Sequence, residues 1–266
     1  GSGTITLSAV AAGGGGTAGG SVTLGGLLTT NATGSAVYIN TDAAVVDGGD
    51  LHVDIVADSA GAVTTIDAKT GVGSGAALET TVAAIDVDNA TSGNIQILET
   101  NAITVLQLDN DTADDNDGST GSITLDTTNG TITVEDSAAV PAGVGVTAID
   151  GNITLNANGT NSDLVVENVI QTSNPGDNAA AGVTIALSAD DSVTFTAEGD
   201  VTGTGNVTVT VTSNAETVTT AGNGGDAIFM ADGALIDAGS GTITLSAVAA
   251  GGGTAGGSVT LGGLLT

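Results

Sequence analysis

The sequence of 266 residues contains no cysteine, no tryptophan and only two prolines. Aromatic residues make up 1% of the chain and are limited to Tyr38, Phe195 and Phe229. The lack of cysteine excludes disulfides and thiolate chemistry, and compact globular cores normally contain more aromatic side chains. Yet 40% of the residues are hydrophobic, mostly small aliphatics. This composition predicts a fold with a narrow interior.

Positive charge is also nearly absent. Lys69 is the one residue counted as basic, against 30 acidic residues, which gives a formal net charge of −29. Because nucleic acids and anionic membrane surfaces attract basic proteins, we expect neither as a partner. No apolar run approaches the roughly 20 residues of a membrane-spanning helix, so we expect no membrane insertion. An acidic surface favours a polymer that stays soluble or is cross-linked by divalent cations.

The same scarcity argues against an enzyme. One histidine without any cysteine cannot build a zinc site from nitrogen and sulfur ligands. Parallel β-helices include polysaccharide lyases, but cleavage of acidic polysaccharides requires cationic side chains that this chain lacks. We therefore expect no catalytic residues. We place His52 on the outer face of a strand and Lys69 on the surface near Asp67.

One short phrase recurs along the chain: glycine, any residue, Ile or Val, Thr, then Leu or Val. It begins at Gly3, Gly20, Gly121, Gly130, Gly151, Gly205, Gly241 and Gly257. Each phrase alternates apolar and polar residues, which is typical of a β-strand with one buried face. The inward positions are predicted to be Ile5, Leu7, Val22, Leu24, Ile123, Leu125, Ile132, Val134, Ile153, Leu155, Val207 and Val209.

The segment that begins at Ala227 contains three short strands, AIFM, ALID and TITL, within about 20 residues. Three strands in that length make one turn of a parallel β-helix, in which each strand pairs with its equivalent one turn later. The chirality of parallel crossovers predicts a right-handed coil. The sequence thus predicts an all-β, right-handed parallel β-helix with about 20 residues per turn. The alternative is a string of immunoglobulin-like β-sandwiches.

The first 29 residues return at the end of the sequence. Residues 239–266 repeat residues 1–29 with the loss of a single glycine. Folding does not require such identity, so we interpret it as a tandem duplication. Residues 1–238 are then one long unit, and residues 239–266 are the first turns of the next. About a dozen turns of 20 residues would advance the rod by roughly 55–60 Å per unit.

Three segments show the style of these repeats well: ADGALIDAGSGTITLSA, GNITLNANGT and GSITLDTTNGTITVEDSAA. They resemble the degenerate repeats of filamentous-haemagglutinin-like surface proteins of bacteria. The resemblance covers essentially the whole chain and rests on the style of the repeats. It implies a right-handed parallel β-helix, export to the cell surface and a role in adhesion or in extracellular fibres. It implies no catalytic residues.

The most acidic stretch offers a candidate calcium site. It contains Asp109, Asp111, Asp114, Asp115 and Asp117, followed by Gly118. Hard cations prefer several carboxylates around a tight turn. The match to the EF-hand pattern is partial, because Ala113 occupies the first position and Thr124 the twelfth. A solvated loop remains the alternative. We expect no other cofactor.

These observations predict a structural repeat of an extracellular bacterial filament or giant cell-surface protein. Its partners would be further copies of itself, end to end and side by side. The alternative is a segment of an adhesin that binds a cell surface or glycan through a lateral face, with calcium as a requirement. Thr-x-Thr sequences such as Val207–Thr212 are typical of ice-binding columns, but they share no common register in the sequence. We interpret them as ordinary outward residues of strands.

Overall fold

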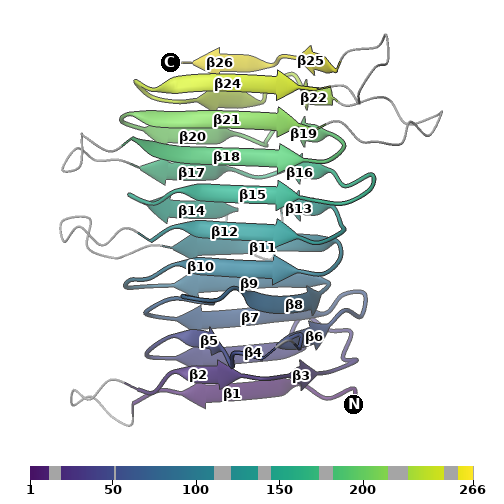
Figure 1. The fold of residues 1–266 in the computed structure, drawn as a ribbon, viewed down its shortest axis with the longest axis vertical. Coiled ribbons are helices and arrows are strands. Elements are labelled where there is room, and N and C mark those ends of the chain that lie inside the picture. Colours follow the sequence, from purple (N-terminus) through teal and green to yellow (C-terminus); the bar gives the residue numbers. More distant parts are fainter. Residues whose placement is uncertain are drawn as a thin grey trace.

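The computed structural model describes residues 1–11, 19–50, 52–110, 121–136, 145–173, 182–214, 227–248 and 257–265. These residues form 26 β-strands that coil around one long axis (Figure 1). Strands at the front run to the right and strands at the back run to the left as the chain rises from the N-terminus. The coil is therefore right-handed. All paired strands are parallel, which confirms the parallel β-helix and excludes the immunoglobulin-like alternative.

Two large sheets form the walls of the coil. Sheet A contains β1 (Ile5–Ala9), β4 (Val37–Thr41), β7 (Val63–Ala68), β9 (Ala84–Asn89), β11 (Ile103–Asn110), β13 (Ile132–Val134), β14 (Val146–Ile149), β16 (Leu164–Val166), β17 (Ile170–Ser173), β19 (Val193–Phe195), β20 (Val201–Thr204), β22 (Ala227–Met230), β23 (Leu235–Asp237), β25 (Ser258–Thr260) and β26 (Gly263–Leu265). Sheet B contains β3 (Leu27–Leu28), β6 (Ile55–Ala57), β8 (Leu78–Val82), β10 (Ile95–Glu99), β12 (Ile123–Thr127), β15 (Ile153–Ala157), β18 (Val183–Ala189), β21 (Val207–Ser213) and β24 (Thr242–Ala247). β2 (Val22–Leu24) and β5 (Val45–Asp47) form a third, two-stranded sheet. In the described part of the chain, no helix is long and apolar enough to cross a membrane.

The core consists of columns of aliphatic side chains that run from coil to coil. Ile123, Ile153, Ile185 and Val209 are in register in successive strands of sheet B, and all four are fully buried. Burial of each such side chain stabilises the fold by about 1.5–3 kcal/mol. The predicted inward residues are confirmed: those from Ile123 to Val209 are fully buried, and Leu24 is 3% exposed. Ile5, Leu7 and Val22, in the first coil, are partly buried against the core.

The glycine of the repeated phrase allows the coils to stack closely. A Cβ at Gly151 would overlap the carbonyl oxygen of Gly121 in the coil below. A Cβ at Gly241 would overlap the carbonyl oxygen of Val207 in the same way. Glycine is therefore required at these positions because another backbone lies where a side chain would begin.

Buried polar residues close the corners of the coil. Glu99, the last residue of β10, is fully buried, and its carboxylate accepts hydrogen bonds from Thr80 Oγ1 and from the N–H groups of Val82, Thr100 and Asn101. At another corner Asn89 Nδ2 donates to Asn110 Oδ1 of the next coil at 2.8 Å. These side chains supply the bonds that the backbone of a turn cannot make for itself.

The length of the coil is not constant. Ile85 pairs with Val105, 20 residues later, so the predicted length holds between β9 and β11. Ile123 and Ile153 are 30 residues apart, and Val209 and Ile243 are 34 apart. The connections at the corners account for the difference, because the number of residues paired within the sheets changes little.

The two sheets exchange roles halfway along the molecule. In the lower coils one long strand lies in sheet A and two short strands lie opposite, as in the coil of β1, β2 and β3. In the upper coils the long strand lies in sheet B and the two short strands lie in sheet A, as in β24, β25 and β26 (Figure 1). The exchange occurs at β11, which pairs with β9 on one side and with both β13 and β14 on the other. The register shifts between Val105 and Gln107, which leaves Leu106 as a bulge.

As a result, the two copies of the repeated sequence occupy different sheets. Ile5 lies in sheet A and its copy Ile243 lies in sheet B. Eight steps of pairing lead from β1 to β22 in sheet A, and β24 follows half a coil later. The copies are thus eight and a half coils apart, fewer than the predicted dozen. At about 4.8 Å per coil, the unit advances by about 40 Å instead of 55–60 Å.

Candidate functional site: the open ends of the coil

The two copies of the repeated sequence form the first and last coils of the described structure. β1, β2 and β3 make up the first coil, and β24, β25 and β26 make up the last. Each of these strands pairs with a neighbour on one side only. The ends therefore present rows of unpaired N–H and C=O groups, which are templates for a further strand.

The first copy shows what covers the upper side of this coil. β4, β5 and β6 pair with β1, β2 and β3 respectively. Leu24 is buried beneath this second coil, with 3% exposure, whereas its copy Leu261 is 52% exposed. The same leucine is thus buried where another coil follows and exposed where none does.

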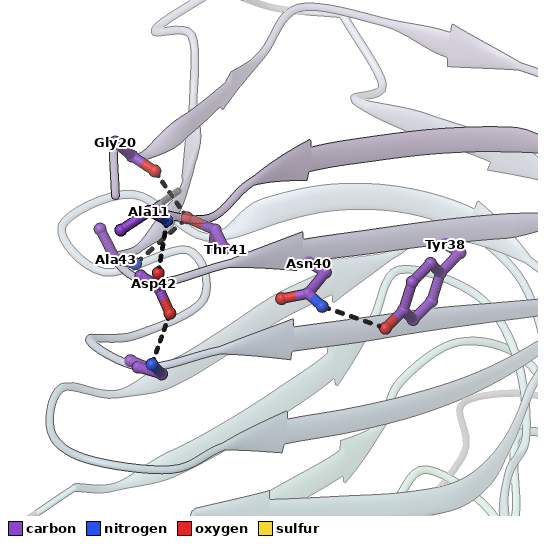
Figure 2. A network of polar contacts seen from close by, with 8 residues as sticks. Ala11, Gly20, Tyr38, Asn40, Thr41, Asp42 and Ala43 are labelled. Carbon is purple, nitrogen blue, oxygen red and sulfur yellow. Dashed lines mark hydrogen bonds and ion pairs between the residues drawn. The ribbon is translucent and has the colours of Figure 1, made fainter. Parts of the chain in front are cut away.

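Side chains of the second coil also secure the first. Thr41 Oγ1 donates to the carbonyl oxygen of Gly20 at 2.6 Å, and the N–H of Ala11 donates to Asp42 Oδ2 at 2.7 Å (Figure 2). Asp42 also pairs with Lys69 of the third coil. The Lys69 ammonium, followed by the Ala11 N–H, holds the pKa of Asp42 below its usual value. One carboxylate therefore links three successive coils.

The second copy shows what lies beneath this coil. β24 pairs with β21, and Gly241 stacks closely on Val207. At Gly3, the equivalent of Gly241, a Cβ would have nothing within 4 Å. The glycine that close stacking requires in the last coil has no such role in the first. Taken together, the two copies describe one coil with neighbours above and below.

The end coils carry no charge. All 30 acidic residues and Lys69 lie between Asp42 and Asp237, so neither residues 1–29 nor residues 239–266 contain any of them. Most of the large apolar side chains exposed in the described structure are also in the end coils: Val10, Leu28, Val248, Val259, Leu261, Leu264 and Leu265. The ends are therefore apolar and neutral, whereas the rest of the chain is strongly acidic. This contrast was readable from the sequence, but composition averaged over the whole chain hides it.

The acidic stretch predicted to bind calcium is described only at its beginning. Asp109, near the end of β11, accepts a hydrogen bond from Gln107 Nε2 at 3.2 Å. In register it continues a line of acids, Asp67 and Asp88, in the two coils below. Asp111, Asp114, Asp115 and Asp117 lie outside the described residues.

The neighbouring outer positions of sheet A also show the effect of crowded acids. Burial, followed by the nearby charges of Asp67 and Asp88, raises the pKa of Asp86. Tyr38 donates a hydrogen bond to Asp67 Oδ2 at 2.6 Å, and this bond raises the pKa of Tyr38. Like charges in adjacent strands repel, so this face disfavours close contact with a second acidic surface.

The two isolated basic side chains do not form a site. His52 lies in the connection between β5 and β6 rather than in a strand, and its ring pairs with Asp50 at 3.2 Å. The side chain of His52 is 82% exposed. Lys69 is on the surface as predicted, but its partner is Asp42 of the preceding coil rather than Asp67.

A flat array of hydroxyl groups lies on the outer face of sheet B. Contrary to the expectation from sequence, the threonines of β21 are in register with residues of β18 and β24. The three columns are Thr184, Thr208 and Thr242; Ala186, Thr210 and Thr244; and Ser188, Thr212 and Ser246. Unequal corner connections hide this alignment in the sequence. A lateral binding face, if the chain has one, would use such a surface.

The fold and these ends define a parallel β-solenoid whose first and last coils are open and nearly identical in sequence. Comparisons with protein-family models, with curated proteins and with solved structures give no match.

Proposed function

We propose that the protein is a structural repeat of an extracellular bacterial filament or giant cell-surface protein, and that its coils continue without a break from one copy of the unit to the next. The observation that supports this most directly is the complementarity of the two open ends. The upper side of the repeated coil packs against β4, β5 and β6, and its lower side packs against β21, β22 and β23.

The mechanism is mechanical. Hydrogen bonds between coils run along the axis, and the aliphatic columns run beside them. A junction made by the repeated coil has the same bonds and columns as the interior, so it would be no weaker than any other level of the rod. The neutral ends favour stacking, while the acidic sides keep separate rods apart.

Assembly of the purified chain tests the proposal. We expect rods whose length is a multiple of one chain, seen by electron microscopy and by sedimentation. Gly3→Val adds a side chain at the lower end and Leu264→Asp adds a charge at the upper end, so each variant should stay as single particles. Leu98→Asp is the matched control, because Leu98 is an exposed leucine on the side of the rod.

Two results would contradict the proposal: a wild-type chain that stays single at every concentration, or end variants that assemble as the wild type does. The mass of the native protein under denaturing conditions then separates two forms of the rod. A mass of many copies indicates a covalent array. A mass near 25.0 kDa indicates separate subunits joined by strand pairing at their ends.

A further inference from the structure

Three carboxylates meet at one corner of the lower coils. Asp47 is the last residue of β5, Asp54 immediately precedes β6, and Glu79 lies in β8 of the next coil. One oxygen from each of the three side chains lies within 4.8 Å of the other two. Asp54 and Glu79 are tied together by the backbone, since the N–H of Asp54 donates to the carbonyl oxygen of Glu79 at 2.8 Å.

Two oxygens in this cluster are buried without any hydrogen-bond donor. Asp54 is fully buried, and its Oδ2 accepts the N–H of Glu79 at 3.2 Å. Asp54 Oδ1 and Glu79 Oε2 have no hydrogen-bond partner. Burial of a carboxylate oxygen without a donor is costly, and a second carboxylate beside it adds repulsion. An arrangement of this kind is stable only if a proton or a cation lies between the carboxylates.

No basic side chain of the described residues neutralises the cluster. Lys69 pairs with Asp42, and His52 pairs with Asp50. Burial, followed by the charges of Asp47 and Glu79, raises the pKa of Asp54 to about 7, although the N–H of Glu79 opposes this shift. Near neutral pH a single proton is therefore held weakly, and a cation can replace it.

The ligand chemistry favours calcium. All the donors are oxygens, which hard cations prefer, whereas zinc usually takes nitrogen and sulfur. Two oxygens on one ion are separated by at most twice the metal–oxygen distance, which is about 4.8 Å for calcium and about 4.2 Å for magnesium. The half-buried positions of Asp47 and Glu79 leave access for the water ligands that calcium also requires.

We propose that Asp47, Asp54 and Glu79 form a calcium site that fastens β5 and β6 of the second coil to β8 of the third. The ion supplies the charge that the two donor-free oxygens need. It also crosses the boundary between coils, so calcium binding stabilises their stacking. This site differs from the acidic stretch at Asp109–Asp117, and it does not depend on assembly of the rod.

Thermal unfolding of the full chain at neutral pH, with calcium or with a chelator, tests the site. Calcium should raise the melting temperature of the wild type and of the control Asp86→Asn, which removes one half-buried acid elsewhere. Asp54→Asn keeps an oxygen for the N–H of Glu79 but loses the charge, so its melting temperature should not respond to calcium. In chelator Asp54→Asn should be at least as stable as the wild type, because the repulsion is gone.

Glu79→Gln provides a second variant with the same expected loss of the calcium response. Titration calorimetry should show one calcium-binding event that is present in the wild type and in Asp86→Asn and absent from both cluster variants. A wild type that does not respond to calcium would overturn the proposal. So would a response that persists in Asp54→Asn and Glu79→Gln, or one that is lost only in Asp115→Asn with Asp117→Asn.

Discussion

Two buried acids show how the surroundings of a single residue decide its role. Glu99 is fully buried, yet four donors surround its carboxylate. Burial raises the pKa of Glu99, and the hydrogen bonds from Thr80, Asn101, Val82 and Thr100 oppose that change. Asp54 is equally buried but has one donor to its side chain, from Glu79. Glu99 therefore closes a corner, whereas Asp54 is left with an unmet need for positive charge.

The raised pKa of Asp54 predicts a pH dependence of stability. The pKa of Asp54 is about 7 in the folded chain and 3.8 in its reference state. The folded state resists losing this proton, so its contribution to stability is full below about pH 4 and is lost as the pH rises toward about 7. In chelator, the urea midpoint of the wild type should fall over this range more than that of Asp54→Asn. Parallel profiles for the two proteins would show that Asp54 ionises normally.

Residues at the corners were harder to predict from the sequence than residues in the strands. Alternation in GNITL is sufficient to place Ile153 and Leu155 inside. Alternation also places Glu99 inside, because Ile95 and Ile97 precede it at even spacing, but a buried glutamate contradicts the usual preference. Asp47, Asp54 and Glu79 are separated by 7 and 25 residues. Their meeting depends on the length of one particular coil, which no local pattern reveals.

At the level of the strand, the columns of the core make each inward residue depend on its neighbours above and below. Ile153 of β15 lies between Ile123 and Ile185. Ile153→Asp would bury an unpaired carboxylate in this column and should destabilise the chain by about 4 kcal/mol or more. Thr154→Asp, on the outer side of the same strand, should cost less than about 0.5 kcal/mol. Urea unfolding followed by circular dichroism measures both, and equal effects would refute the assigned facing of β15.

The exchange of sheets at β11 shows a limit of prediction at this level. The phrases GTITL and GSVTL mark strands wherever they occur, but the same phrase lies in sheet A at β1 and in sheet B at β24. A strand pattern encodes which side chains point inward and does not encode which wall of the coil the strand joins. The bulge at Leu106, which interrupts the alternation of β11, is the local signal of the exchange.

For the whole molecule, the exchange has a geometric consequence for any rod built from this unit. Eight and a half coils separate the two copies of the repeated sequence, so the second copy begins on the opposite wall. The first and last coils are related by a half-turn about the long axis as well as by an advance of about 40 Å. Successive units should therefore present the same lateral surface on alternate sides of the rod.

Decoration of the rod tests this half-turn. The chain has no cysteine, so Leu98→Cys gives one labelling position on the outer side of β10, near the middle of the unit. After biotinylation and binding of streptavidin, electron micrographs should show density on alternate sides of the rod from one unit to the next. Decoration along a single side would mean that the exchange at β11 is cancelled elsewhere in the unit. Since alternation places the acidic face of sheet A on both sides of the rod, side-by-side association through divalent cations would then be open to neighbours in two opposite directions rather than one.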